Sequence, residues 1–140
     1  LLDKYCTIQQ DFAQRPAVQQ AAEMADAADE SLAWMVDYLY RHFDAFTLLI
    51  CCSAGTEYSA YMDKMVEIEV TATLRFIEDM HRAGQPVNDV DRQLIHILAN
   101  AFFAGIFEVV VHEMPKDKAI GYINRLKEFY TAGWLKILGL

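Results

Sequence analysis

Few of the residues that usually do chemistry stand at spacings that would bring them together. The four histidines, His42, His81, His96 and His112, are scattered along the chain. Glu108 lies four residues before His112, so the two can meet on one helix face, but a metal site needs about two further ligands. The sequence also holds no glycine-rich phosphate loop and no serine in a tight glycine turn. We therefore expect no enzymatic activity, no metal site and no cofactor.

The cysteines leave two interpretations open. There are three, an odd number, and Cys51 and Cys52 are adjacent, which does not suit a framework of disulfide bonds. This usage favours a reducing, cytoplasmic setting. Either the adjacent pair packs in the interior as small apolar side chains, or it senses oxidants or binds a metal or haem together with a histidine. The first interpretation is favoured, because free cysteines are commonly buried.

Aromatic and methionine side chains carry a stronger signal. They recur at helical spacing on three segments, and such residues usually fill a core. Methionine, however, adapts to irregular space at binding surfaces, and buried tyrosine hydroxyls need hydrogen-bond partners. We therefore predict a cavity for a small lipophilic ligand, lined by Trp34, Met35, Tyr38, Tyr61, Met62, Met65, Glu69, Phe102, Phe103 and Ile106.

Glu69 is the one acid in this set. It shares a broad helix face with Met62, Met65, Thr73 and Phe76. A carboxylate among apolar neighbours is costly unless it is paired. It either orients a polar or cationic group of a ligand or simply points to water, and the sequence leaves both possibilities open.

Helices must position all these residues. The chain has only 6 Gly and 3 Pro in 140 residues, strand-like alternation is absent, and helical spacing runs throughout. We predict an all-α domain of about six helices. The expected helices are 2–13, 16–42, 45–53 capped by Asp44, 56–82 after a turn at 53–56, a fifth capped by Asn88 or Asp89 and running to about 113, and 116–138.

Composition limits the classes of partner. The chain carries 12 Lys and Arg against 20 Asp and Glu, a formal charge of −8, so it is a poor nucleic-acid binder by itself. Its length suits one domain, and no apolar run approaches the ~18 residues of a membrane span. A helical pattern is already running at Leu1, so we expect the protein to continue before it.

The last two predicted helices have the character of an association surface. One face of the fifth carries Ala101, Gly105, Glu108 and His112, and the apolar stripes of the last carry Leu126, Phe129, Tyr130 and Gly133. Helices that are apolar on more than one face cannot bury everything in so short a chain. A homodimer that joins them into an intersubunit four-helix bundle would do so. The alternative is that both faces pack within one subunit.

The end of the chain resembles the last helix of TetR/AcrR-type transcriptional regulators. In residues 119–139, AIGYINRLKEFYTAGWLKILG, the residues YI, L, FY and AGW follow a pattern common in that family. The segment 102–108, FFAGIFE, followed by Val111 and His112, is similar to the family's penultimate helix. Residues 1–13 are similar to the helix that connects the DNA-binding head to the regulatory domain. The resemblance covers essentially the whole chain, without the helix-turn-helix.

This resemblance implies a regulatory domain. Such domains dimerise through their last two helices and bind a small, often lipophilic effector among the inner helices. Effector binding shifts the connecting helix, here with Tyr5, Ile8 and Phe12 facing the body, and operator DNA is contacted only by the absent N-terminal domain. Two other interpretations stay open: a dimerisation or scaffold bundle with a filled interior, and, less favoured, a haem or metal sensor.

Overall fold

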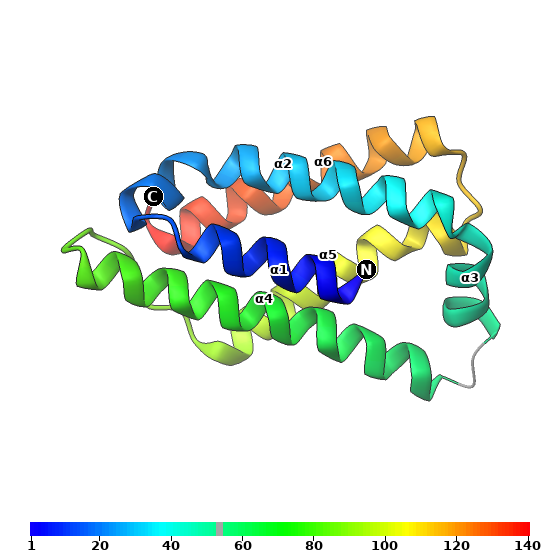
Figure 1. The fold of residues 1–140 in the computed structure, drawn as a ribbon, viewed down its shortest axis with the longest axis horizontal. Helices are drawn as coiled ribbons and strands as arrows, with labels where there is room; N and C mark the ends of the chain where they lie inside the picture. Colours follow the sequence, from blue (N-terminus) through cyan, green and yellow to red (C-terminus); the bar gives the residue numbers. More distant parts are fainter. Residues whose placement is uncertain (53–54) are drawn as a thin grey trace.

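The chain is all-α. The computed structural model describes residues 1–52 and 55–140, and within them it contains six α-helices and one short π-helical segment and no strand (Figure 1). The elements are α1 (Leu2–Ala13), α2 (Ala17–Arg41), α3 (Phe43–Thr47), the π-helical η1 (Leu48–Cys52), α4 (Thr56–Arg82), α5 (Arg92–Val111) and α6 (Lys116–Leu138). The predicted class and the approximate number of helices are therefore confirmed.

The four long helices form an elongated bundle (Figure 1). α4 packs against both α1 and α5, while α2 contacts α1, α4 and α6. α1 runs between α2 and α4, and the short α3 closes one end of the bundle (Figure 1). The first helix is thus not a peripheral arm, because it forms part of the wall of the interior.

The main core lies between α2, α4 and α5. Met35 and Leu39 of α2, Met65 of α4, and Phe103 and Ile106 of α5 are almost completely buried in it. The pair on α2 stands four residues apart and the pair on α5 three, so each of these helices presents an apolar stripe to its neighbours. Burial of this stripe, rather than helix propensity, supplies most of the stability of such helices.

The junction between α1 and α2 is fixed by Gln20. Its side chain is buried, and its amide donates hydrogen bonds to the backbone carbonyls of Arg15 (2.7 Å) and Ala13 (3.4 Å). The last carbonyls of a helix have no intrahelical partner, so this side chain satisfies groups that would otherwise be buried unpaired. Pro16 stands at the N-cap of α2, so the helix begins one residue later than predicted, at Ala17.

Two predicted caps are wrong. α3 begins at Phe43 after His42, without a side-chain cap, so Asp44 lies in its first turn rather than before it. α5 is capped by Asp91, whose carboxylate accepts from the backbone N–H of Gln93 (2.8 Å), and not by Asn88 or Asp89. Asn88 instead donates to the carbonyl of Ile137 (3.1 Å) and so ties the loop before α5 to the end of α6.

The segment after α3 also differs from the prediction. A single α-helix over 45–53 was expected, but the chain changes to π-helical geometry at Leu48–Cys52. Of the turn predicted at 53–56, Ser53 and Ala54 lie outside the described residues. Cys51 and Cys52 are exposed, so the interpretation that they pack in the interior is wrong.

α5 is the most apolar helix. The 20 residues Arg92–Val111 are long and apolar enough to cross a membrane by length and composition alone, although polar residues interrupt the run. This is weak evidence for a span, because core helices of soluble proteins pass the same test. Its face with Ile95, Phe103 and Phe107 lies in the core of the bundle.

Candidate ligand-binding site

A cavity of about 380 Å³ that opens to the surface lies in the bundle and is lined by residues of α1, α2, α4, α5 and α6. Its volume falls in the range of about 300–1,000 Å³ that is usual for small-molecule sites. Most of its lining side chains are apolar, and the polar ones are spread over α1, α2, α4 and α6. Residues that line it include Tyr5, Ile8, Gln9, Phe12, Ala21, Ala25, Ala28, Ser31, Met35, Glu69, Thr73, Phe76, Phe102, Phe103, Lys127, Tyr130 and Trp134.

Small side chains on α2 create the space. Ala21, Ala25 and Ala28 all line the cavity and stand four and three residues apart, which places them on one face of the helix. A methyl group cannot reach across to α4 and α6, so the interior stays unfilled along this stretch. Further along α2, the larger Leu32 and Met35 close the cavity, and from Met35 onward the helix packs tightly in the core.

Aromatic rings form the opposite walls. Phe102 of α5 packs against Tyr130 of α6 with ring centroids 5.0 Å apart. Phe103 meets the ring of Tyr5 edge-to-face at 5.7 Å, a favourable arrangement for aromatic pairs. Trp134 of α6 completes this lining. The cavity therefore presents flat, polarisable surfaces to anything that enters.

A polar cluster stands within this apolar lining. Tyr5 of α1 donates its hydroxyl hydrogen to Oε2 of Glu69 on α4, and the amide of Gln9 donates to the same oxygen at 3.0 Å. The Gln9 amide also donates to the Tyr5 hydroxyl oxygen at 2.9 Å. α1 and α4 are thus joined by hydrogen bonds inside the cavity wall, 64 residues apart in sequence for the Tyr5–Glu69 pair.

Burial governs the charge state of this cluster. It raises the pKa of the Glu69 carboxyl above its ordinary value, and the hydrogen bond from Tyr5 offsets this only in part. Burial likewise raises the pKa of the Tyr5 hydroxyl, and the nearby Glu69 carboxylate adds to the effect. The tyrosine therefore stays a neutral donor, while the acid is held in surroundings that disfavour its charge.

Lys127 is the other charged residue in the lining. Its ammonium group forms an ion pair with Asp29 of α2, so its charge is already balanced. Among the residues that the structure describes, no cation pairs with Glu69. The possibility that Glu69 simply points to bulk water is not what the structure shows, because its carboxyl belongs to the cavity wall.

Four of the ten predicted ligand residues line this cavity: Met35, Glu69, Phe102 and Phe103. Three others, Met62, Met65 and Ile106, are buried in the main core and do not reach it. They occupy the same helix stripes as the lining residues, but lie nearer the end of the bundle where α3 fills the interior. Helical spacing identified which face of each helix points inward, but not which part of that face lines the cavity.

The remaining three predicted residues lie in an aromatic cluster at that end. Trp34 packs against Tyr38, with Lys4 lying over its ring at 4.5 Å, and Tyr61 packs edge-to-face on Phe46. The buried hydroxyl of Tyr61 has no hydrogen-bond partner among the described residues, and burial raises its pKa. None of these three tyrosine and tryptophan side chains lines the cavity.

The predicted association residues divide between surface and interior. On α5 and at its C-cap, Ala101, Glu108 and His112 are exposed, and Nε2 of His112 lies 3.0 Å from Oε2 of Glu108. On α6, Phe129 and Gly133 are exposed as well.

Three residues of the predicted seam are instead directed into the chain. Gly105 packs against Leu126 of the same chain, so closely that a Cβ added there would lie 2.9 Å from Leu126 Cδ2. Tyr130 lines the cavity. Two residues that were not predicted extend the exposed face of α5: Leu94 and Ile97, which are 41% and 60% exposed.

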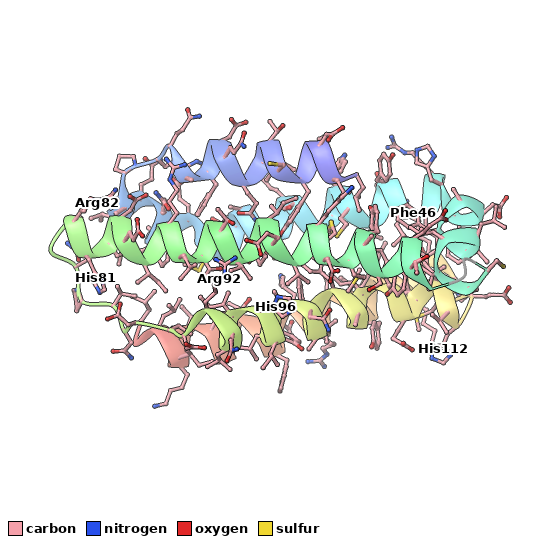
Figure 2. The ribbon with its side chains drawn as sticks, turned by 90° about the horizontal axis from the view of Figure 1, so that it is seen from below. Phe46, His81, Arg82, Arg92, His96 and His112 are labelled. Carbon is pink, nitrogen blue, oxygen red and sulfur yellow. The ribbon has the colours of Figure 1, made fainter. Side chains whose placement is uncertain are left out.

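The histidines stay as dispersed in space as they are in sequence. His81 lies at one end of the bundle, His112 at the other, and His96 between them (Figure 2). Over residues 1–52 and 55–140, no group of three His, Cys, Asp or Glu side chains is placed to hold a metal ion.

Several cavity residues were missing from the predicted ligand set. Tyr5, Ile8 and Phe12 of α1 were expected only to face the body, and Gln9 and Trp134 were not assigned to the site. The alanines of α2 that line the cavity were not assigned to the site either. Their run of small side chains opposite aromatic residues was the signal that could have located the cavity.

Comparison with models of known protein families, with curated proteins and with solved structures gives no match for this chain. What the protein does must therefore be inferred from its own residues and from the cavity that they enclose.

Proposed function

We propose that this chain is the regulatory domain of a transcriptional regulator similar to the TetR/AcrR type. In this proposal it binds a small lipophilic effector and transmits that binding through a homodimer to an N-terminal DNA-binding domain. The observation that carries the proposal is the cavity of about 380 Å³ with α1 as one of its walls. Residues 1–13 resemble the helix that connects the regulatory domain to the DNA-binding head, so a ligand in contact with α1 would act on that connection.

The position of α1 makes it sensitive to occupancy. Ile8 and Phe12 line the cavity, while Tyr5 and Gln9 bond to Glu69 on α4. A ligand in contact with both helices alters the balance between positions of α1, provided that it binds one position more tightly. Equal affinity for both would change nothing, and a tenfold shift in operator affinity needs about 1.4 kcal/mol of difference.

An exposed face on α5 and α6 supports the dimer. It contains Leu94, Ile97 and Ala101 of α5 with Phe129 and Gly133 of α6, all exposed. Ala101 and Gly133 are small, so a second backbone can approach closely between the larger side chains. A second copy placing the same face against this one would form a symmetric four-helix interface. The operator itself would be contacted only by another domain, since this chain has a formal charge of −8.

A scaffold bundle without a ligand is the second candidate. Protein interiors are normally filled to the density of organic crystals, with few voids larger than a water molecule. A cavity of this size, kept open by alanines and faced by aromatic rings, favours a bound small molecule over a purely structural interior.

Native mass spectrometry is the direct experiment. The chain has a mass of 16.0 kDa, so monomer, dimer and dimer with a retained small molecule are easily separated. We expect a dimer that carries added mass or takes up lipophilic compounds. A monomer that binds none of them would contradict the proposal.

A cavity-filling variant identifies the binding place. Ala28→Phe inserts a ring into the cavity and should abolish uptake. Val18→Phe is the matched control, because Val18 lies on the same helix, is 59% exposed and does not line the cavity. Equal uptake by both variants would place the binding elsewhere.

A further inference from the structure

We infer that the cavity selects a lipophilic molecule carrying one positive charge, and that the Glu69 carboxylate binds its cationic group. This inference rests on the proposed function, because it names the class of ligand for the same cavity. Four features of the cavity support it.

The first is an unused oxygen. Tyr5 and Gln9 both donate to Oε2 of Glu69, and no described residue donates to Oε1. Oε1 is not sealed in the protein either, because the Tyr61 hydroxyl is the only buried side-chain polar atom without a partner among the described residues. With Glu69 in the cavity wall, Oε1 is available to accept a hydrogen bond from a ligand.

The second feature is the charge of the lining. Glu69 and Lys127 are its charged residues, and Lys127 is neutralised by Asp29. The side chains that α1, α2 and α5 contribute are all uncharged, and on α4 Glu69 is the sole charged lining residue. A monocation would leave the occupied cavity neutral, whereas an anion would meet a carboxylate with no free cation to bind.

The third feature is the aromatic wall. Tyr5, Phe102, Phe103, Tyr130 and Trp134 bring five rings to the cavity. Aromatic faces attract ammonium groups through their quadrupole and also cover alkyl or aryl parts of a ligand. A molecule that is both apolar and cationic uses both properties, and a neutral hydrocarbon uses only one.

The fourth feature is the balance of charge in the empty cavity. Burial raises the pKa of Glu69, so the ligand-free carboxyl tends toward its neutral form, and a cation beside it favours the charged form. Binding of the cation is therefore accompanied by release of a proton wherever Glu69 is protonated beforehand. The titratable groups around it are Tyr5 on α1, Tyr130 and the paired Lys127 on α6, and none on α2 or α5.

Three ligands of one shape test the inference. Decylammonium, decanol and decanoate share a chain and differ in charge. Binding is followed by calorimetry and by the emission of Trp134 in a Trp34→Phe background, where Trp134 is the remaining one of the two tryptophans. Since a hydrogen bond to a charged group is worth about 1.5–3 kcal/mol, decylammonium should bind roughly 10-fold or more tightly than decanol, and decanoate weakest.

Two variants assign the effect to Glu69. Glu69→Gln keeps the shape and should weaken decylammonium by roughly 10-fold or more while changing decanol little. Glu67→Gln is the control, because Glu67 lies two residues away on α4, is exposed and pairs with Arg92 (labelled in Figure 2). Decylammonium affinity should also fall as the pH is lowered from 8 to 5 in the wild type, and stay level in Glu69→Gln.

The outcomes separate the two proposals. If the three ligands bind alike, or if Glu69→Gln leaves decylammonium affinity unchanged, the cation preference is overturned and the cavity remains a ligand site. If none of the three binds, the proposed ligand-binding function fails and the cation preference with it. Circular dichroism of each variant checks that loss of binding is not loss of folding.

Discussion

Replacing Phe129 should separate the proposed dimer into monomers. This side chain is 74% exposed on α6, and an aromatic residue offers about 200 Å² to burial, so roughly 150 Å² stays uncovered in each chain. At ~25 cal/mol per Å², complete cover of both copies in a symmetric dimer contributes about 7 kcal/mol. With half of that area covered, Phe129→Ser should cost about 3.5 kcal/mol, which is a weakening of association by roughly 300-fold.

Sedimentation equilibrium over a wide range of concentration measures this change. Leu48→Ser is the matched control, because Leu48 is 64% exposed but lies on η1, outside the proposed dimer face on α5 and α6. Both variants should retain the helicity and melting behaviour of a folded chain, since neither residue belongs to the core. The reasoning is refuted if Phe129→Ser associates as tightly as the wild type, or if Leu48→Ser weakens association equally.

Three further substitutions test the packing around the site by denaturant unfolding. Burial raises the folded-state pKa of Glu69, so the stability gained from its protonation is complete below about pH 4.5 and is lost as the pH rises. Glu69→Gln should therefore be more stable than the wild type at pH 7, and the difference should vanish toward pH 4.5. A difference that stays constant with pH would contradict this. Gln20→Met removes the hydrogen bonds to Arg15 and Ala13 and should lower the free energy of unfolding by about 1–3 kcal/mol, whereas an unchanged midpoint would show that those carbonyls need no partner. Gly121→Ala meets open space inside α6 and should raise the free energy of unfolding by about 0.5–1 kcal/mol, and a loss of stability would mean that this face is covered.

The helices were predictable because their ends carry strong local signals. Pro115 precedes α6, and Gly84 with Pro86 follows α4, so α6 begins and α4 ends where local chemistry requires. The start of α5 was not predictable in the same way. Asn88, Asp89 and Asp91 are all good capping residues, and the choice depends on the contact of Asn88 with the end of α6, which no local signal encodes.

The candidate site was predictable only in part, because helical spacing shows which side chains point inward but not where along the bundle the interior is left unfilled. Met65 and Glu69 stand four residues apart on α4 and face the same way, yet Met65 is fully buried in the core and Glu69 lines the cavity. What distinguishes them is the opposite helix, α2, which carries Leu39 in the core and alanines at the cavity. Which residues of α2 lie opposite each residue of α4 depends on how the helices pack, and the sequence of a single helix does not contain that information.

The participation of α1 in the cavity wall has a consequence for how such a protein could change over evolution. Tyr5 and Gln9 help to shape the site and also fasten α1 to Glu69. A substitution at either position alters which molecules fit and, at the same time, how firmly the helix is held. Selection for a new ligand through α1 would therefore alter the response as well, whereas changes at Thr73 or Thr131, which line the cavity from α4 and α6, leave that fastening intact. Diversification of ligand preference should accordingly accumulate on α4 and α6 rather than on α1.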